Sequence, residues 1–239
     1  NANLLIQRTE YKNQKFYDMA ISAVNNSICI NNFCDLTSWL TEMKSNFYLE
    51  INKKSLIDLN PWVFNCGKLE RKDKKFFSII GVNVEIENRE VIKWDQPMIK
   101  PFENGLIIFL VTKFKGIYHF LVQAKLEAGN LDKFEIGPTI QCKIPDFEEK
   151  NKKNNIPFLN LIRGKKNLDI LFDSCQSEEG GRFYRESNRH LIVEIDKNQI
   201  KEIPKNYIWI SLNQLLSFNK YNNFLNISAR SLISVIRYS

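Results

Sequence analysis

The chain has 239 residues, of which 44% are hydrophobic and 26% charged, so it can form one large or two small globular domains. This composition excludes disordered and low-complexity chains, and no apolar run approaches the roughly 18 to 20 residues that cross a bilayer. Residues 1–10 lack the basic start and apolar centre of a secretory signal. Five Cys residues without C-x-x-C spacing argue against a disulfide framework and a zinc site, so we expect a cytoplasmic protein without membrane association.

The net charge of +7 indicates an anionic partner only weakly. Much of the positive charge stands in short runs such as 72–75 and 150–153, which are usually solvated. No stacking motif interleaves with these runs, so we do not expect a nucleic-acid-binding protein.

Secondary-structure signals change in character along the chain. Apolar residues at helical spacing predict a first helix over 17–24, and Asp35 is expected to cap a second one. Branched and aromatic residues then predict strands over 76–86, 105–114, 116–127, 168–172 and 190–195. The short link from Lys113 to Gly116 predicts a hairpin. Short helices with Ser caps are expected at 211–218 and 228–237.

Helices at both ends with strands between them predict an α+β domain with a largely antiparallel or mixed sheet. We divide the chain into an N-terminal helical segment, residues 1–60, and one continuous module, residues 61–239. The charged, Asn-rich segment 146–155 is expected to be an exposed loop within that module.

The strand predicted over 117–127 carries polar residues at alternate positions. Its even positions are apolar, whereas its odd positions place His119, Gln123, Lys125 and Glu127 on one face. A plain solvent-facing strand would show the same pattern, and the strand alone favours that simpler interpretation. Turns at Gly129–Asn130 and Gly137–Gln141 follow it, with small hydrogen-bonding groups.

The densest polar cluster of the sequence runs from Gln176 to Arg185 around a pair of glycines. Guanidinium, amide, hydroxyl and aromatic groups suit a pocket for a phosphorylated and hydroxylated ligand. A surface turn whose Arg and Glu residues pair with each other explains the cluster equally well.

These segments, together with others, resemble the NDP-hexose 2,3-dehydratases of deoxysugar biosynthesis. The matching blocks, in chain order, are Trp62, Arg71–Ser78, Trp94–Pro97, His119–Asn130, Gly137–Gln141, Gln176–Arg185 and a tail with Trp209, Gln214, Asn226, Ala229 and Arg230. The blocks cover nearly the whole chain beyond about Asp35.

The resemblance implies a Nudix-hydrolase-like α/β/α sandwich, with a mixed sheet flanked by helices. The Nudix metal box is echoed only by Arg89–Glu90 without the downstream carboxylates, so we expect neither a metal nor a cofactor. The implied substrate is a nucleotide-linked 4-keto-6-deoxyglucose, most often the thymidine diphosphate form. Loss of water across C2 and C3 gives an enol that tautomerises to a 3,4-diketo-2,6-dideoxy sugar.

This chemistry needs a base near C3, a donor to the C4 oxygen and an acid for the departing hydroxyl. Glu127 or His119 could be the base, Lys125 or Tyr184 the donor or acid, and Glu178 a second acid. His119 could equally be a hydrogen-bonded strand residue, and Lys125 with Glu127 a simple ion pair. The expected substrate-binding residues are Arg71, Arg182 and Arg185 for the diphosphate, Trp94 for stacking, and Gln96, Gln123, Asn130, Thr139, Gln141 and Gln176 for sugar oxygens.

Typical members of the resembled family carry two copies of this module in one chain, whereas this sequence has one. We therefore expect a homodimer of single modules, with a downstream 3-ketoreductase or aminotransferase as the next enzyme in the pathway. A non-catalytic nucleotide-sugar-binding module that assists another chain is the alternative function.

Overall fold

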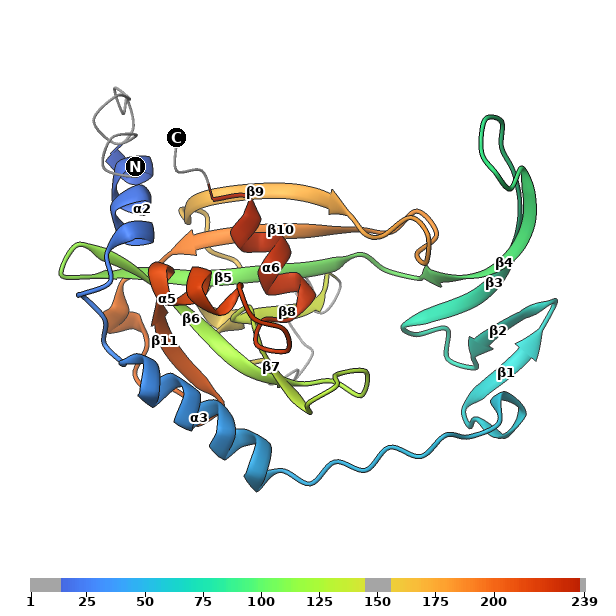
Figure 1. Ribbon diagram of the computed structural model, residues 1–239, viewed down its shortest axis with the longest axis horizontal. Coiled ribbons are helices and arrows are strands. Elements are labelled where there is room, and N and C mark those ends of the chain that lie inside the picture. Colours follow the sequence, from blue (N-terminus) through green and yellow to red (C-terminus); the bar gives the residue numbers. More distant parts are fainter. Residues whose placement is uncertain (1–13, 145–155, 237–239) are drawn as a thin grey trace.

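The computed structural model describes residues 14–144 and 156–236, and the strands of this part form two sheets (Figure 1). The larger, seven-stranded sheet has the order β11-β6-β5-β10-β9, with β7 paired to β6 and β8 paired to β5. Its strands are β5 (Gly105–Phe114), β6 (Ile117–Leu126), β7 (Phe134–Gly137), β8 (Ile140–Lys143), β9 (Asp169–Ser177), β10 (Ser187–Glu194) and β11 (Tyr207–Ser211). Strand β10 runs parallel to β5 and the other pairs are antiparallel, which confirms the predicted mixed sheet.

The smaller sheet is an antiparallel meander of four strands. These are β1 (Trp62–Asn65), β2 (Lys68–Arg71), β3 (Phe77–Glu85) and β4 (Lys93–Pro101). The chain reaches this sheet from the helices through an extended stretch and the short 3₁₀ helix η1 (Leu56–Asp58), and the sheet stands to one side of the larger one (Figure 1). A bridge between Ile99 and Phe183 joins it to the β9–β10 connection.

Helices cover one face of the larger sheet. They are α2 (Gln14–Val24), α3 (Phe33–Asn46), α5 (Leu212–Phe218) and α6 (Ile227–Ser234), and all contribute to one apolar core with Phe109 and Phe120. A second core on the opposite face joins Ile108 and Leu121 to the 3₁₀ helix η2 (Leu159–Leu161). A third 3₁₀ helix, η3 (Lys197–Gln199), follows β10. The predicted α+β class, a mixed sheet flanked by helices, is confirmed.

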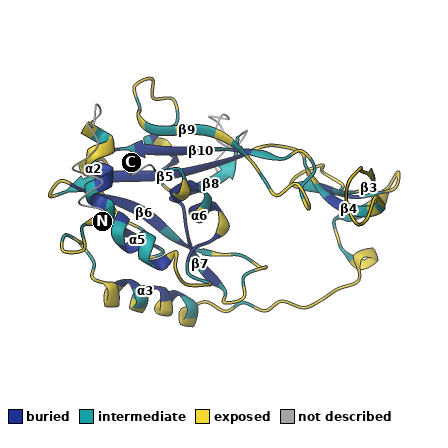
Figure 2. Ribbon diagram, turned by 45° about the horizontal axis from the view of Figure 1, so that its top comes forward, coloured by how far each residue is buried: buried dark blue, intermediate teal, exposed yellow. Residues whose placement is uncertain are grey.

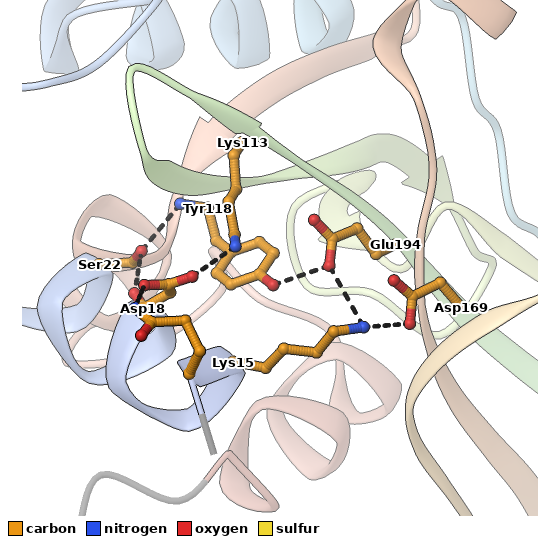
Figure 3. A network of polar contacts seen from close by, with 8 residues as sticks. Lys15, Asp18, Ser22, Lys113, Tyr118, Asp169 and Glu194 are labelled. Atoms are coloured by element: carbon orange, nitrogen blue, oxygen red, sulfur yellow. Dashed lines mark hydrogen bonds and ion pairs between the residues drawn. The ribbon is translucent and has the colours of Figure 1, made fainter. Parts of the chain in front are cut away.

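Polar contacts fix helix α2 to the larger sheet (Figure 3). Lys113 pairs with Asp18, and the Ser22 hydroxyl accepts a hydrogen bond of 2.8 Å from the Tyr118 backbone N–H. The Tyr118 hydroxyl donates to Glu194 at 2.8 Å, and burial next to this carboxylate raises the pKa of Tyr118. The α2 contacts and the apolar core therefore tie the N-terminal helices to the sheet, although the domain boundary placed at residue 60 stays a prediction.

Several expectations need correction. Asp35 does not cap the second helix: Asn32 does, and Asp35 occupies the third helical position, where its carboxylate accepts the Asn32 backbone N–H at 2.7 Å in a capping box. Similarly, Asn226 rather than Ser228 caps α6. The odd face of β6 is not solvent-facing in its first half, because the second core covers it there and leaves His119 and Leu121 fully buried. The expected loop over 146–155 lies outside the described residues.

Candidate functional site

The larger sheet forks where β5 and β6 separate. The two strands pair up to Leu110 and Leu121, after which β6 pairs with β7 and β5 with β8. Thr139, between β7 and β8, is fully buried at this fork. Its hydroxyl accepts the Leu110 N–H at 2.9 Å and donates to the Leu121 carbonyl oxygen. Thr139 thus links β5 to β6 through its hydroxyl, which bonds a main-chain group of each strand.

Beyond the fork, side chains from β6, the residue after it, β7 and the cap of α6 form the group that we call the Lys125 cluster: Gln123, Lys125, Glu127, Glu135 and Asn226. Glu135 lies directly opposite Lys125 on β7, so the two side chains share one face. The Lys125 ammonium lies 3.3 Å from a carboxylate oxygen of Glu127. The cluster therefore pairs one amine with the carboxylate of Glu127 and sets a second carboxylate, Glu135, opposite it in the strand register.

Burial shifts the pKa values of Lys125 and Glu135 away from those of solvent-exposed side chains. It lowers the pKa of Lys125, while the nearby Glu127 carboxylate opposes that shift. Burial also raises the pKa of Glu135; Arg230 opposes the shift and Glu127 adds to it. A carboxyl group with a raised pKa can donate a proton, and a partly desolvated amine can exchange one, at a pH closer to neutrality than usual.

Gln123 is held in place at the start of the cluster. Its amide nitrogen donates to the Pro138 carbonyl oxygen at 2.8 Å, and its amide oxygen accepts from the Tyr207 hydroxyl at 3.4 Å. A cavity of about 790 Å³ lies beside it along β6, where α3 and residues 205–206 form its other walls. Cavities of this size accommodate drug-sized ligands.

Gly137 and Asn226 complete this face. A Cβ atom on Gly137 would lie 3.0 Å from Nδ2 of Asn226 and 3.4 Å from Cβ of Lys125, so the missing side chain lets these two residues pack close to the strand. Sequence reasoning missed Glu135, which falls in none of the motif blocks. Asn226 and Arg230 stood in the matching tail but received no role.

A second group of expected site residues lies on the smaller sheet and the β9–β10 connection. Trp94 donates its indole N–H to Gln96 at 2.7 Å, and the Gln96 amide donates to the Gly181 carbonyl oxygen at 2.8 Å. The backbone of Tyr184 donates to the Ile99 carbonyl oxygen at 2.7 Å. We call this set, with Arg182 and Arg185, the arm cluster.

The arginines near the smaller sheet are already engaged by acidic or aromatic groups. Arg182 lies 3.4 Å from Glu179 with most of its side chain exposed, and Arg185 lies 5.3 Å from the Tyr184 ring. Arg71 contacts Asp73 with two nitrogen atoms and holds the pKa of that carboxyl at about 2. The surface-turn interpretation, in which Arg and Glu pair with each other, is therefore realised for Arg182.

His119 does not join the Lys125 cluster. It stands six residues before Lys125 on β6, about 20 Å along the strand. Its Nδ1 bonds the Ile117 carbonyl oxygen at 2.9 Å, and burial lowers its pKa. It lines a different cavity of about 420 Å³ with Phe114, Lys115 and Lys197.

The remaining expected residues are dispersed. Glu178 accepts the Asn188 amide at 2.6 Å, and Asn188 in turn accepts the Gly105 N–H, also at 2.6 Å, so Glu178 supports the start of β5. Asn130 lies in the β6–β7 turn and donates to the Lys133 carbonyl oxygen at 3.1 Å. Gln141 pairs across from Ile107 with its amide oxygen buried and unpartnered, and Gln176 pairs across from Asn188.

The described part of the chain lacks two kinds of feature. Residues 14–144 and 156–236 contain no group of three or more His, Cys, Asp or Glu that could hold a metal ion. No helix in the same ranges is long and apolar enough to cross a membrane. The five cysteines all lie in these ranges, and none of them forms a disulfide bond.

Comparison with known proteins identifies relatives over most of the chain. The family model for NDP-hexose 2,3-dehydratase matches residues 34–236. Two similar proteins are dTDP-4-dehydro-6-deoxy-alpha-D-glucopyranose 2,3-dehydratases. That of Saccharopolyspora spinosa is 33% identical over 92% of this chain and 46% of its own length, and that of Streptomyces violaceoruber is 36% identical over 72% and 38%. The chain thus spans less than half the length of these relatives.

The crystal structure of an ADP compounds hydrolase is similar with a TM-score of 0.43 and 12% identity, over 77% of this chain and 95% of that one. Similarity at this level is too low to carry an argument about fold or function. The sequence match is different in kind, because the family model extends from α3 to the end of α6 and includes every member of the Lys125 cluster. This chain belongs to the NDP-hexose 2,3-dehydratase family, as the motif blocks predicted.

Proposed function

We propose that this chain is a nucleotide-sugar 2,3-dehydratase that eliminates water across C2 and C3 of dTDP-4-keto-6-deoxyglucose. The product is a 3,4-diketo-2,6-dideoxy sugar. The names of the similar proteins support this substrate and reaction. The observation that carries the proposal is the Lys125 cluster, in which one partly desolvated amine pairs with Glu127, has Glu135 opposite it on the neighbouring strand and lines a cavity.

The reaction sets clear demands on the site. The C3 proton is acidic because it lies next to the C4 ketone, and the enolate that forms places negative charge on the C4 oxygen. Hydroxide is a poor leaving group from C2, so it needs a proton as the C2–O bond breaks. The proton removed from C3 and the hydroxyl lost from C2 together make the water that is released.

The Lys125 cluster can meet all three demands. We assign the removal of the C3 proton to Glu127 and the stabilisation of the C4 oxygen to the ammonium of Lys125. Glu135, whose pKa is raised by burial, donates the proton to the departing C2 hydroxyl. His119, at the other end of β6, is the weaker candidate for the base. Arg71, Arg182, Arg185 and Trp94 remain our proposal for the diphosphate and the thymine base.

Turnover of the 4-keto-6-deoxy nucleotide sugar in heavy water tests this function. We expect deuterium at C2 of the product, trapped by a reductase or recognised by breakdown to maltol. Lys125→Met should lower turnover by about 100-fold or more, the usual effect of removing one donor to an oxyanion. Lys93→Met, a matched change at a side chain that is 61% exposed on β4, should leave it unchanged. Equal turnover by wild type and Lys125→Met would refute the assignment.

The alternative is a nucleotide-sugar-binding module without catalysis, since the chain matches less than half of each relative. Binding of the nucleotide sugar without turnover, even with a reductase present, would favour this alternative.

We also propose that two copies of the module associate. Phe76, Val91 and Ile92, in the connections next to β3 and β4, expose apolar side chains, which supports a covered face in the dimer. A monomer in light scattering at micromolar concentration would refute it.

A further inference from the structure

The side-chain amide of Asn226 can accept hydrogen bonds through its oxygen and donate them through its nitrogen, and the fold uses only the oxygen. It is the N-cap of α6, and its amide oxygen accepts the Ala229 N–H at 2.8 Å. This bond fixes which side of the amide is oxygen, so the Nδ2 group must point the other way. The cap alone does not require that nitrogen, because Ser and Asp cap helices as well as Asn does.

The Nδ2 group is buried without a partner. Only 2% of Asn226 is exposed, and within the described residues no acceptor bonds its Nδ2. Buried side-chain donors nearly always have a partner, so an unsatisfied one calls for an explanation. A Ser cap would have avoided the problem, which indicates that the amide serves a purpose other than capping.

The position of the amide indicates that purpose. Nδ2 lies 3.0 Å from the point where a Cβ of Gly137 would stand, and Cβ of Lys125 lies 3.4 Å from that same point. Gly137 is opposite Gln123 on the face that carries Lys125 and Glu135. The free donor therefore lies beside the cluster to which we assign the chemistry, and the absence of a side chain on Gly137 lets it approach this closely.

We propose that Asn226 binds substrate in this site, with its Nδ2 donating to the C4 oxygen of the hexose alongside the ammonium of Lys125. This inference rests on the dehydratase function proposed above. A neutral amide and a cation then share the charge that develops on that oxygen when C3 loses its proton. The C4 oxygen of the substrate is then the hydrogen-bond acceptor that Nδ2 of Asn226 lacks in the fold.

The test is Asn226→Ser, which keeps an oxygen for the helix cap and deletes only the amide donor. We expect turnover to fall by about 100-fold, mainly in kcat, as for loss of one oxyanion donor. The thermal midpoint should be unchanged or higher, because a buried unsatisfied group has gone. The matched control is Asn32→Ser, the same change at the cap of α3, which should leave turnover unchanged.

Three outcomes would overturn the inference. One is turnover by Asn226→Ser at the rate of an active wild type. Another is a loss of activity that follows a lowered thermal midpoint, because that result indicates only a helix cap. If wild type itself does not turn over, the proposed function fails, and calorimetry with dTDP-4-keto-6-deoxyglucose decides the inference instead. Binding weakened about tenfold by Asn226→Ser then supports it, and equal binding overturns it.

Discussion

The two sheets differ in what covers them, and that difference decides how their polar residues should be interpreted. Strand β5 of the larger sheet is buried from Gly105 to Thr112, because an apolar run meets a layer on each face. Strand β4 of the smaller sheet alternates exposed and half-buried residues with one buried Met98. Figure 2 shows the contrast as dark blue along β5, β6 and β10 against teal and yellow in β3 and β4.

A buried polar group, the common case in the larger sheet, must find a partner or remain costly, whereas the exposed polar groups that predominate on β4 can bond to water. An unsatisfied Asn226 amide or a partly desolvated Lys125 is therefore informative. The exposed pairs of the arm cluster, such as Arg182 with Glu179, carry less information, since surface ion pairs contribute little free energy. The comparison thus favours the Lys125 cluster as the catalytic part of the site.

The largest expected effect tests the burial difference itself. Phe109→Ala removes a fully buried ring that packs edge-on against Phe120 at 5.3 Å, and should lower the free energy of unfolding by about 3–5 kcal/mol. Phe64→Ala on β1, where the side chain is 61% exposed, should change it by less than about 0.5 kcal/mol. Urea denaturation measures both. Similar losses would show that the smaller sheet is covered in solution.

The next effect tests the fork. Thr139→Val keeps the shape of the side chain but leaves the Leu110 N–H and the Leu121 carbonyl without their shared hydroxyl. We expect a loss of about 2–4 kcal/mol in the free energy of unfolding, because both groups are buried. Thr139→Ser retains the hydroxyl and should lose less than half as much in the same urea titration. Equal losses would assign the effect to packing and not to the two hydrogen bonds.

The contrast between the sheets also explains which elements the sequence could predict. The β5–β6 hairpin follows from local signals: two apolar strands and a Lys115–Gly116 turn with φ of 50° and 80°, as two-residue hairpins require. Strands β7, β8 and β11 have only four or five residues each, and β8 and β11 form by pairing with strands distant in the sequence. Such short strands show no clear alternation of apolar and polar residues, so the sequence did not predict the fork.

The residues of the candidate site divide in the same way. Period-two geometry within one strand is enough to place Gln123, Lys125 and Glu127 on one face. Glu135 was missed because its strand was missed, and the register with β6 alone brings it opposite Lys125. The free amide of Asn226 depends on a helix cap and a distant glycine, which no sequence pattern reports.

The smallest effect concerns pH and again distinguishes the sheets. Both histidines of the chain, His119 and His190, are buried in the larger sheet, with Nδ1 bonded to a backbone carbonyl oxygen. Burial lowers the pKa of each below its ordinary value of 6.5. Below pH 6.5 the histidines of the unfolded chain bind protons, whereas the buried rings of the native protein stay neutral. The free energy of unfolding should therefore fall as the pH decreases below 6.5.

Urea midpoints at pH 7.5 and 5.5 measure this dependence. The double variant His119→Gln/His190→Gln should show a smaller change between the two pH values than wild type, whatever its absolute stability, because neither amide titrates. An identical change in both proteins would assign the acid sensitivity to groups other than the histidines. Asp73 is not one of them, because its pKa of about 2 makes it lose its bond to Arg71 only at much lower pH. Since the smaller sheet contains neither histidine, a reduced slope would report on the larger sheet alone.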